Sequence, residues 1–269
     1  MARVIDQPNP SLVPTRGDLA AGRLKALYRS VIFATVTLLI LLLFWQTAIV
    51  ALDLPSFVVP APLSVFEALQ NDWSRLSGAV GYTLQSALLG LATAFLVAVT
   101  LATLFTMSDG LARAMMPIVI TIRTAPVLAI APLLILIFGR GQATSIAVVV
   151  IVAFFPMMVN ATRGFRSTNR EALELMHVCG ATWLQTFFKV RVPYATPHIF
   201  TGLRTAATSG LLAAMLAEWL SGAPGIGTLI LEAGASRQLP LMWAGVVLTI
   251  ALAFMIFALT VRIERSLNQ

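Results

Sequence analysis

Six long apolar runs constrain the fold of this chain more than any other feature of its sequence. They are Val31–Leu52, Tyr82–Thr106, Met115–Phe138, Ala143–Ala161, His198–Leu220 and Met242–Val261. About 20 consecutive apolar residues span a bilayer as a helix. Charged residues make up only 11% of the chain, against roughly 25% in soluble domains. The sequence therefore predicts an all-α membrane protein with six transmembrane helices, in contact with membrane lipid.

The first run is predicted to be a permanent helix rather than a cleaved signal. The apolar part of a signal peptide has about 7–15 residues behind a short basic start. This run has 22 residues and follows a tail of 30. The single cysteine, Cys179, excludes a disulfide within the chain.

The net charge of +7 is distributed unevenly between the loops. Fifteen of the 18 Lys and Arg residues lie in or next to the N-terminal tail, the 162–197 loop, the short loop at Arg113 and the C-terminus. Only Arg75, Arg140 and Arg237 lie on the other side. Positive charge stays cytoplasmic. We therefore expect a multi-pass membrane protein with both termini and the 162–197 loop in the cytoplasm, and no nucleic-acid binding.

The predicted organisation has three parts. Residues 1–30 form a cytoplasmic tail, 31–77 the first transmembrane helix and an outer loop, and 78–265 the main membrane domain. In the outer loop, apolar residues recur at helical spacing between Ser64 and Trp73. This pattern favours a short interfacial helix with Trp73 at headgroup depth. The loop is either a simple connector or a docking surface for an external partner.

Small residues at every fourth position predict where the spans pack. One stripe consists of Ser86, Gly90, Ala94, Ala98 and Ala102, and another of Gly202, Ala206, Gly210 and Ala214. Helices in lipid approach closely through such residues. The next member of the second stripe is Glu218, so its carboxylate is expected on a protein-packed or water-lined face. It is either a translocation-pathway residue or an interfacial carboxylate with an ordinary hydrogen bond.

The third run carries three interior prolines, Pro117, Pro126 and Pro132, and one charge, Arg123. Each proline removes a helix hydrogen bond and favours a kink. The run is therefore either a pathway wall that changes shape or a static bent helix. Arg123 lies in its first turns and either extends to the cytoplasmic interface or contacts a transported solute. We take Arg123, Pro126 and Glu218 as pathway candidates, although the spans show no anion-binding cluster.

The sequence lacks the residues that nucleotide binding, metal binding and catalysis require. The sequence has no G-x-x-x-x-G-K-[ST] motif for ATP and no H-E-x-x-H motif for zinc. Gly222–Gly227 follows a span rather than a strand, so it predicts a tight turn or a re-entrant segment instead of a phosphate loop. No nucleophile and base are paired for catalysis. We expect neither enzymatic activity nor a metal or cofactor in this chain.

The segment from Thr168 to Pro193 is too charged to cross a membrane and is predicted to form helix, break and helix. Capping boxes are predicted at Thr168 and Thr182. Gly180 suits the left-handed residue that closes a helix. Pro193 is expected to end the second helix. The apolar side of that helix consists of Trp183, Leu184, Phe187 and Phe188.

This segment resembles the E-A-A-x3-G-x9-I-x-L-P signature of integral membrane subunits of binding-protein-dependent ABC importers. Glu174, Gly180 and Pro193 match in identity and spacing, whereas Leu175-Met176 replace the alanines and valines replace isoleucine and leucine. "LPSFVVPAPLSV", "FGRGQATS" and "AEW" at 217–219 before Gly225-Ile226-Gly227 extend the likeness. They resemble the subgroup that imports sulfonates, taurine, nitrate and thiamine precursors.

The resemblance implies a type I importer permease fold with a cytoplasmic coupling helix, and residues 78–265 as its permease domain. It implies a location in the bacterial inner membrane, a cytoplasmic ATPase dimer that holds ATP and Mg²⁺, a second permease subunit in a homodimer, and an external solute-binding protein. The coupling residues it implies are Glu174, Gly180, Ala181, Trp183, Val190 and Pro193. The solute would be a small polar organic molecule or an oxyanion.

Two other functions compete with this interpretation. A stand-alone secondary transporter or channel needs ion-coupling residues in the membrane and usually an internal repeat. No span pair is repeated here, and Glu218 is the only candidate acid. An intramembrane enzyme needs a catalytic pair or a metal set, and neither is visible. Co-purification separates the importer permease from the stand-alone transporter, because a permease should bring down a soluble ATPase.

Overall fold

The structure is a computed structural model that describes residues 16–124 and 126–267, and its regular elements there are all helices. The chain divides into two units, residues 1–63 and 64–269. The first unit contains α1, Arg16–Ala51, which includes the shorter apolar stretch Thr35–Ala51. Of the predicted tail, residues 1–15 lie outside the described residues, and 16–30 form the start of α1.

Four helical segments of the second unit are long and apolar enough to span a membrane. They contain α3 (Trp73–Met107), α6 (Gln142–Arg166), α9 (Val192–Ser221) and α11 (Leu239–Leu267). These helices contain the second, fourth, fifth and sixth predicted runs and confirm the all-α membrane fold. The count of six spans is not confirmed. The described residues give four spans, or five when one bent pair counts as a single span.

That bent pair shows where the third run breaks. Its two helices, α4 (Asp109–Thr124) and α5 (Val127–Phe138), meet at an angle of 97°. Pro126 has extended backbone and precedes α5. Proline lacks the N–H that a continuing helix needs and disfavours helical backbone in the residue before it. Pro117 and Pro132 lie inside their helices without ending them.

Both predicted stripes of small residues are buried, which confirms that they face protein. The side chains concerned are Ser86, Gly90, Ala94, Ala98 and Ala102 on α3, and Gly202, Ala206, Gly210, Ala214 and Glu218 on α9. A Cβ atom added to Gly90 would lie 2.5 Å from Cβ of Val149 on α6. One added to Gly210 would lie 3.2 Å from Cδ2 of Leu91. Because Gly90 and Gly210 have no side chain, α3, α6 and α9 can pack this closely against one another.

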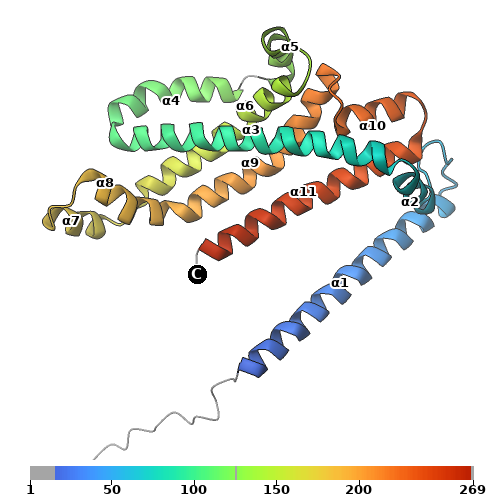
Figure 1. Cartoon of the computed structure of the whole chain (residues 1–269), viewed down its shortest axis with the longest axis horizontal. Helices are drawn as coiled ribbons and strands as arrows, with labels where there is room; N and C mark the ends of the chain where they lie inside the picture. The colour runs from blue at the N-terminus through green and yellow to red at the C-terminus, as the bar shows by residue number, and fades with distance from the viewer. Residues whose placement is uncertain (1–15, 125, 268–269) are drawn as a thin grey trace, which may run out of the picture. The chain divides into compact units, whose positions relative to one another are not determined.

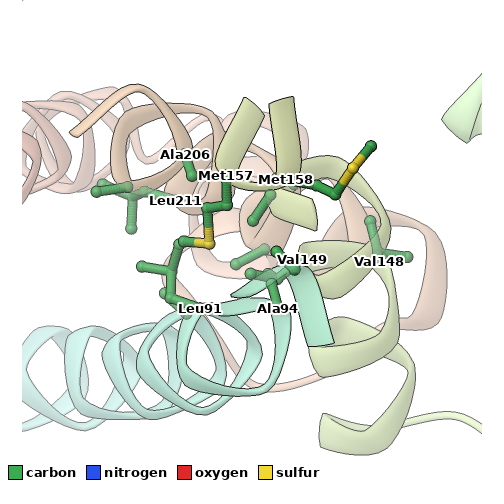
Figure 2. Close-up of a cluster of buried hydrophobic side chains, with 14 of the residues drawn as sticks. Leu91, Ala94, Val148, Val149, Met157, Met158, Ala206 and Leu211 are labelled. Atoms are coloured by element: carbon green, nitrogen blue, oxygen red, sulfur yellow. The ribbon is translucent and has the colours of Figure 1, made fainter. Parts of the chain in front are cut away.

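The core of the second unit lies where these three helices meet. Figure 2 shows Leu91 and Ala94 of α3 together with Met157 of α6 and Leu211 of α9. All four side chains are buried. Because lipid provides no hydrophobic drive between helices, this close packing is what holds the bundle together.

The helix that contains the fifth span begins earlier than predicted. Trp183–Ser221 is one continuous helical segment, made of α8 (Trp183–Thr186), a π-helical turn η2 (Phe187–Arg191) and α9. The N–H of Val192 donates to the carbonyl of Phe187, five residues earlier. The wider turn accommodates Pro193, whose ring would clash with a carbonyl in a regular α-helix. The prediction that Pro193 ends the helix is therefore wrong.

Two short helices lie at the opposite end of α9 from α8, which we call the α10 end (Figure 1). Gly222 closes α9 with left-handed backbone, φ +69°, and α10 (Ile226–Ala235) follows. The predicted turn at 222–227 is thus confirmed. A short helix also exists in the predicted outer loop, as α2 (Pro62–Asn71). α2 ends before Trp73. Phe66 is 54% exposed and does not lie on the buried face that contains Val65.

Candidate coupling surface and translocation groove

The segment between α6 and α9 folds as helix, break and helix, as predicted, at what we call the α7–α8 end (Figure 1). α7 spans Arg170–Val178. Its N-cap is Asn169, whose side chain accepts from the N–H of Glu171, so the capping box predicted at Thr168 is wrong. The one at Thr182 is confirmed, because Thr182 and Gln185 exchange both hydrogen bonds. Gly180 has φ +65°, the left-handed backbone that was expected.

Aromatic contacts attach the second of these helices to the bundle. Phe187 is buried, and its ring centroid lies 5.2 Å from that of Phe165 on α6 and 4.9 Å from that of Trp183. The guanidinium of Arg191 donates to the carbonyl of Phe165 at 3.1 Å. α8 and the turn that follows it are therefore held on the end of α6.

The same segment presents apolar side chains that nothing in the described chain covers. Leu175, Val178, Leu184 and Phe188 are 60–83% exposed, and Trp183 is 39% exposed. We call these five residues the coupling patch. Of the side predicted to be apolar on the second helix, only Phe187 is buried. An exposed apolar surface on an anchored helix pair is typical of a protein–protein interface.

The predicted coupling residues occupy different positions around this patch. Glu174 does not bond across the break. Its Oε1 accepts from Arg170 Nε at 2.9 Å, one turn earlier on α7. Ala181 follows the break, and Val190 lies in the π-helical turn, both partly buried. Pro193 is exposed at the start of α9.

Glu218 is fully buried at the α10 end, as its stripe predicted. Its Oε2 accepts from the N–H of Gly227 at 3.0 Å, and its backbone carbonyl accepts from the Thr228 hydroxyl at 2.9 Å. The hydroxyl of Thr83 on α3 accepts from the N–H of Ile226 at 2.9 Å. The first turn of a helix has unpaired N–H groups. Glu218 and Thr83 satisfy two of them and so attach α10 to α9 and α3.

Arg123 lies in the last turn of α4, not in the first turns of a span. It is exposed, and its guanidinium carbon lies 4.3 Å from the ring centroid of Phe155 on α6. Phe155 stands 13 residues after the start of α6 and 11 before its end, near the middle of that span. Arg123 is 14 residues from Asp109, about 21 Å along the helix. Arg123 therefore stands beside the middle of α6.

An open groove between α4 and α6 runs from Phe155 toward the α7–α8 end. Its volume is about 500 Å³. Its lining residues are Met116, Ile120, Phe155, Val159, Thr162, Arg163, Arg166 and Ser167. We call it the α4–α6 groove. Pro126, a pathway candidate, marks the break that follows Arg123 and does not line it.

Comparison with known proteins decides between the functions that the sequence left open. Residues 94–269 match the model of the family described as binding-protein-dependent transport system inner membrane component. The chain belongs to this family. It is a permease subunit of an ABC importer, and the stand-alone transporter or channel is not supported.

Two relatives lie in the predicted subgroup. The formylaminopyrimidine transport permease protein ThiX of Halalkalibacterium halodurans (strain ATCC BAA-125 / DSM 18197 / FERM 7344 / JCM 9153 / C-125) is 32% identical over 72% of this chain and 77% of that protein. The taurine transport system permease protein TauC of Escherichia coli (strain K12) is 28% identical over 88% of this chain and 90% of that protein. These matches confirm the resemblance stated from the sequence.

A solved structure shares the permease fold. A chain of the MetNI methionine ABC transporter, in inward facing conformations, superposes with a TM-score of 0.67. The match covers 74% of this chain and 99% of that chain, at 19% identity. This similarity confirms the type I importer-like fold. As a member of this family, the chain is a multi-pass inner membrane component that works with an ATPase and a binding protein.

Sequence reasoning missed several residues that the permease uses to build these sites. Arg166 donates to Asp109 Oδ1 at 2.8 Å and to the carbonyl of Phe105 at 3.3 Å, and so joins the end of α6 to α3 and α4. Phe155 lies inside the fourth apolar run and Phe165 just beyond its end, and nothing in the sequence marks either residue. Only Asn169 had a usable signal, because Asn is favoured at an N-cap as strongly as Thr.

Proposed function

We propose that the coupling patch binds the cytoplasmic ATPase and that the α7–α8 end therefore faces the cytoplasm. The exposure of five apolar side chains on a segment fixed by Phe187 and Arg191 is the observation that supports this assignment. In this arrangement the α10 end and α2 face outward. We also place both termini in the cytoplasm, on the distribution of positive charge.

The proposed roles of the coupling residues follow from their positions and contacts. Gly180 permits the break, Ala181 and Trp183 begin the second helix, and Val190 and Pro193 lie where it joins α9. Glu174 carries an exposed carboxylate beside the patch and contacts the ATPase. ATP and Mg²⁺ are held by that partner. The rest of the pathway comes from a second permease subunit, which we propose is a copy of this chain.

We propose further that the solute is a small polar organic molecule or an oxyanion delivered by an external binding protein. The relatives named for formylaminopyrimidine and taurine support this class. Lipid surrounds the remaining apolar faces. The pathway candidates are Arg123, Pro126 and Glu218, of which Arg123 alone is both charged and exposed beside an open groove.

The coupling assignment is tested by co-purification of the ATPase with permease variants. Leu184→Ser and Val178→Ser should release the ATPase, because each removes apolar area from the patch. Leu231→Ser, the same change to an exposed leucine on α10, is the matched control. Retention of the ATPase by both patch variants at normal membrane levels would disprove the assignment.

Glu174 is tested in the same assay. Its ion pair with Arg170 is exposed, and such i,i+4 pairs contribute only about 0.3–0.5 kcal/mol to folding. Glu174→Ala should therefore insert normally but retain less ATPase and transport less, whereas Glu171→Ala on the same helix should behave as wild type. Gly180→Val should fail similarly, because a β-branched residue resists positive φ. Full transport by Glu174→Ala would remove it from the coupling residues.

Orientation is tested with single cysteines at Ser64 and Ser167 after replacement of Cys179 by serine. An impermeant thiol reagent added to intact cells should label the cysteine at 64 and not the one at 167. The reverse pattern would overturn the proposed topology and with it the cytoplasmic placement of the coupling patch.

A further inference from the structure

The α4–α6 groove is built from matching faces of two helices. Met116 and Ile120 are one turn apart on α4, and Arg123 follows three residues later on the same face. On α6, Phe155, Val159 and Arg163 recur at the same spacing. The contact between Arg123 and Phe155 therefore places the guanidinium at the mid-span end of the groove.

The other end of the groove is also basic. Arg163 and Arg166 line it, and an adjoining hollow of about 470 Å³ shares Met116 and Arg166 and adds Arg113 and Asp109. From Phe155 to Arg163 is eight residues, about 12 Å along the helix. Positive charge thus stands at both ends of a short passage from mid-span to the α7–α8 end.

Little negative charge compensates these arginines. Arg113, Arg163 and Arg166 line the two hollows, and Arg123 stands at the mid-span end through its contact with Phe155. Asp109 is the single acidic residue that lines them. Asp109 pairs with Arg166. Among the described residues, no carboxylate lies within ion-pair distance of Arg123 or Arg163. Four positive charges and one negative charge leave a net +3 around the passage.

A charge near mid-span is costly and normally faces a partner or a water-filled cavity. Arg123 has an aromatic face instead of a carboxylate, so its charge is not neutralised. Arg also stays protonated in any environment in a protein. A cleft lined by one sign of charge concentrates ions of the opposite sign.

We infer that the α4–α6 groove is the anion-selecting half of the translocation pathway and that Arg123 is its specificity-determining residue. The transported solute is then a small anion with an oxyanion group such as a sulfonate, rather than a neutral heterocycle. This inference rests on the proposed function and narrows its substrate class. Arg123 binds the oxyanion at mid-span, and Arg163 and Arg113 attract it toward the α7–α8 end.

The test measures the potential in the groove with charged thiol reagents. Ile120, which is 48% exposed in the groove, is replaced by cysteine in the full-length Cys179→Ser chain, in open membrane fragments. The rates of modification by sulfonatoethyl and by trimethylammonium-ethyl methanethiosulfonate are compared. The control cysteine replaces Ile122, 45% exposed and two positions away, hence on another face of α4.

At position 120 the ratio of anionic to cationic rates should exceed the control ratio by roughly tenfold, since each unit charge within about 10 Å changes the local ion concentration by a large factor. Arg123→Gln should remove most of this preference, and Arg123→Lys should keep it. Equal ratios at the two positions, no effect of Arg123→Gln, or a cysteine at 120 that neither reagent reaches would each overturn the inference.

The measurement needs neither the ATPase nor the binding protein, so its outcome is independent of the coupling test. An anionic preference without ATPase retention would refute the proposed coupling surface alone. ATPase retention by a chain with no anionic preference would refute the anion-selecting groove alone.

Discussion

Glu218 and Arg123 are the two ionisable residues that the sequence marks within the spans as pathway candidates, and the structure gives them opposite surroundings. Glu218 is fully buried and accepts a hydrogen bond from the backbone of α10. Arg123 is exposed, stacks on Phe155 and has no carboxylate partner among the described residues. A charge in a span therefore has two uses, which are distinguished by what surrounds it: Glu218 fixes a helix, and Arg123 remains available to a solute.

The largest expected effect comes from crowding the Glu218 site. A Cβ atom on Gly225 would overlap the Glu218 carboxyl group, which cannot move because it is enclosed. Gly225→Ala should therefore sharply reduce the folded protein recovered from membranes. Gly78→Ala is the control, since a Cβ there meets nothing within 4 Å. Equal recovery of the two variants would show that the α10 end is loosely packed.

The next largest effect is expected from Glu218 itself. Glu218→Ala leaves the buried N–H of Gly227 without an acceptor and opens a cavity, at a cost of about 2–4 kcal/mol. Glu218→Gln keeps an acceptor oxygen and should lose less. Thermal unfolding in detergent, followed for both variants, measures the difference. If alanine is tolerated as well as glutamine, the hydrogen bond to α10 is not what Glu218 provides.

Arg123 should give the opposite pattern, with a small effect on stability and a large one on transport. An exposed cation–π contact is worth about 0.5–1 kcal/mol, so Arg123→Ala should unfold within a few degrees of wild type. Uptake of the anion should nevertheless fall. A loss of stability as large as that of Glu218→Ala would show that Arg123 has a structural role. The contrast between Arg123 and Glu218 would then not hold.

The smallest effect is expected from the ion pair between Arg75 on α3 and Glu232 on α10, 3.2 Å apart. Both side chains are about half exposed, and such pairs contribute about 0–1 kcal/mol. Arg75→Ala should therefore leave the unfolding temperature nearly unchanged, and added salt should abolish any difference. A shift comparable to that of Glu218→Ala would mean that this surface pair, and not the buried carboxylate, attaches α10.

Much of the fold could be predicted because it depends on local pattern. Apolar runs follow from the thickness of the bilayer, and the stripes through Gly90 and Gly210 follow from helical periodicity, so both were predictable from spacing alone. Gly180 and Thr182 were likewise identified correctly, because a left-handed break and a capping box involve residues that are adjacent in the chain.

The errors arose where one element depends on another. The helix through Pro193 continues because a π-helical turn accommodates the ring, and nothing in the sequence distinguishes that turn from a stop. The break at Pro126 is sharp whereas Pro117 and Pro132 are tolerated inside helices. The same residue type thus has different effects, because neighbouring contacts determine whether a lost hydrogen bond is compensated.

The sequence by itself determined that this chain is a multi-span helical permease, since apolar length, small-residue periodicity and the coupling signature are all properties of contiguous residues. Only the tertiary structure decided what the two charged pathway candidates, Glu218 and Arg123, do. Glu218 meets an N–H nine residues later only because α10 turns back at Gly222, and Arg123 meets Phe155 only because α4 packs on α6. Hydrogen bonding, burial and electrostatic potential depend on distances in space, and these distances exist only after the helices have assembled.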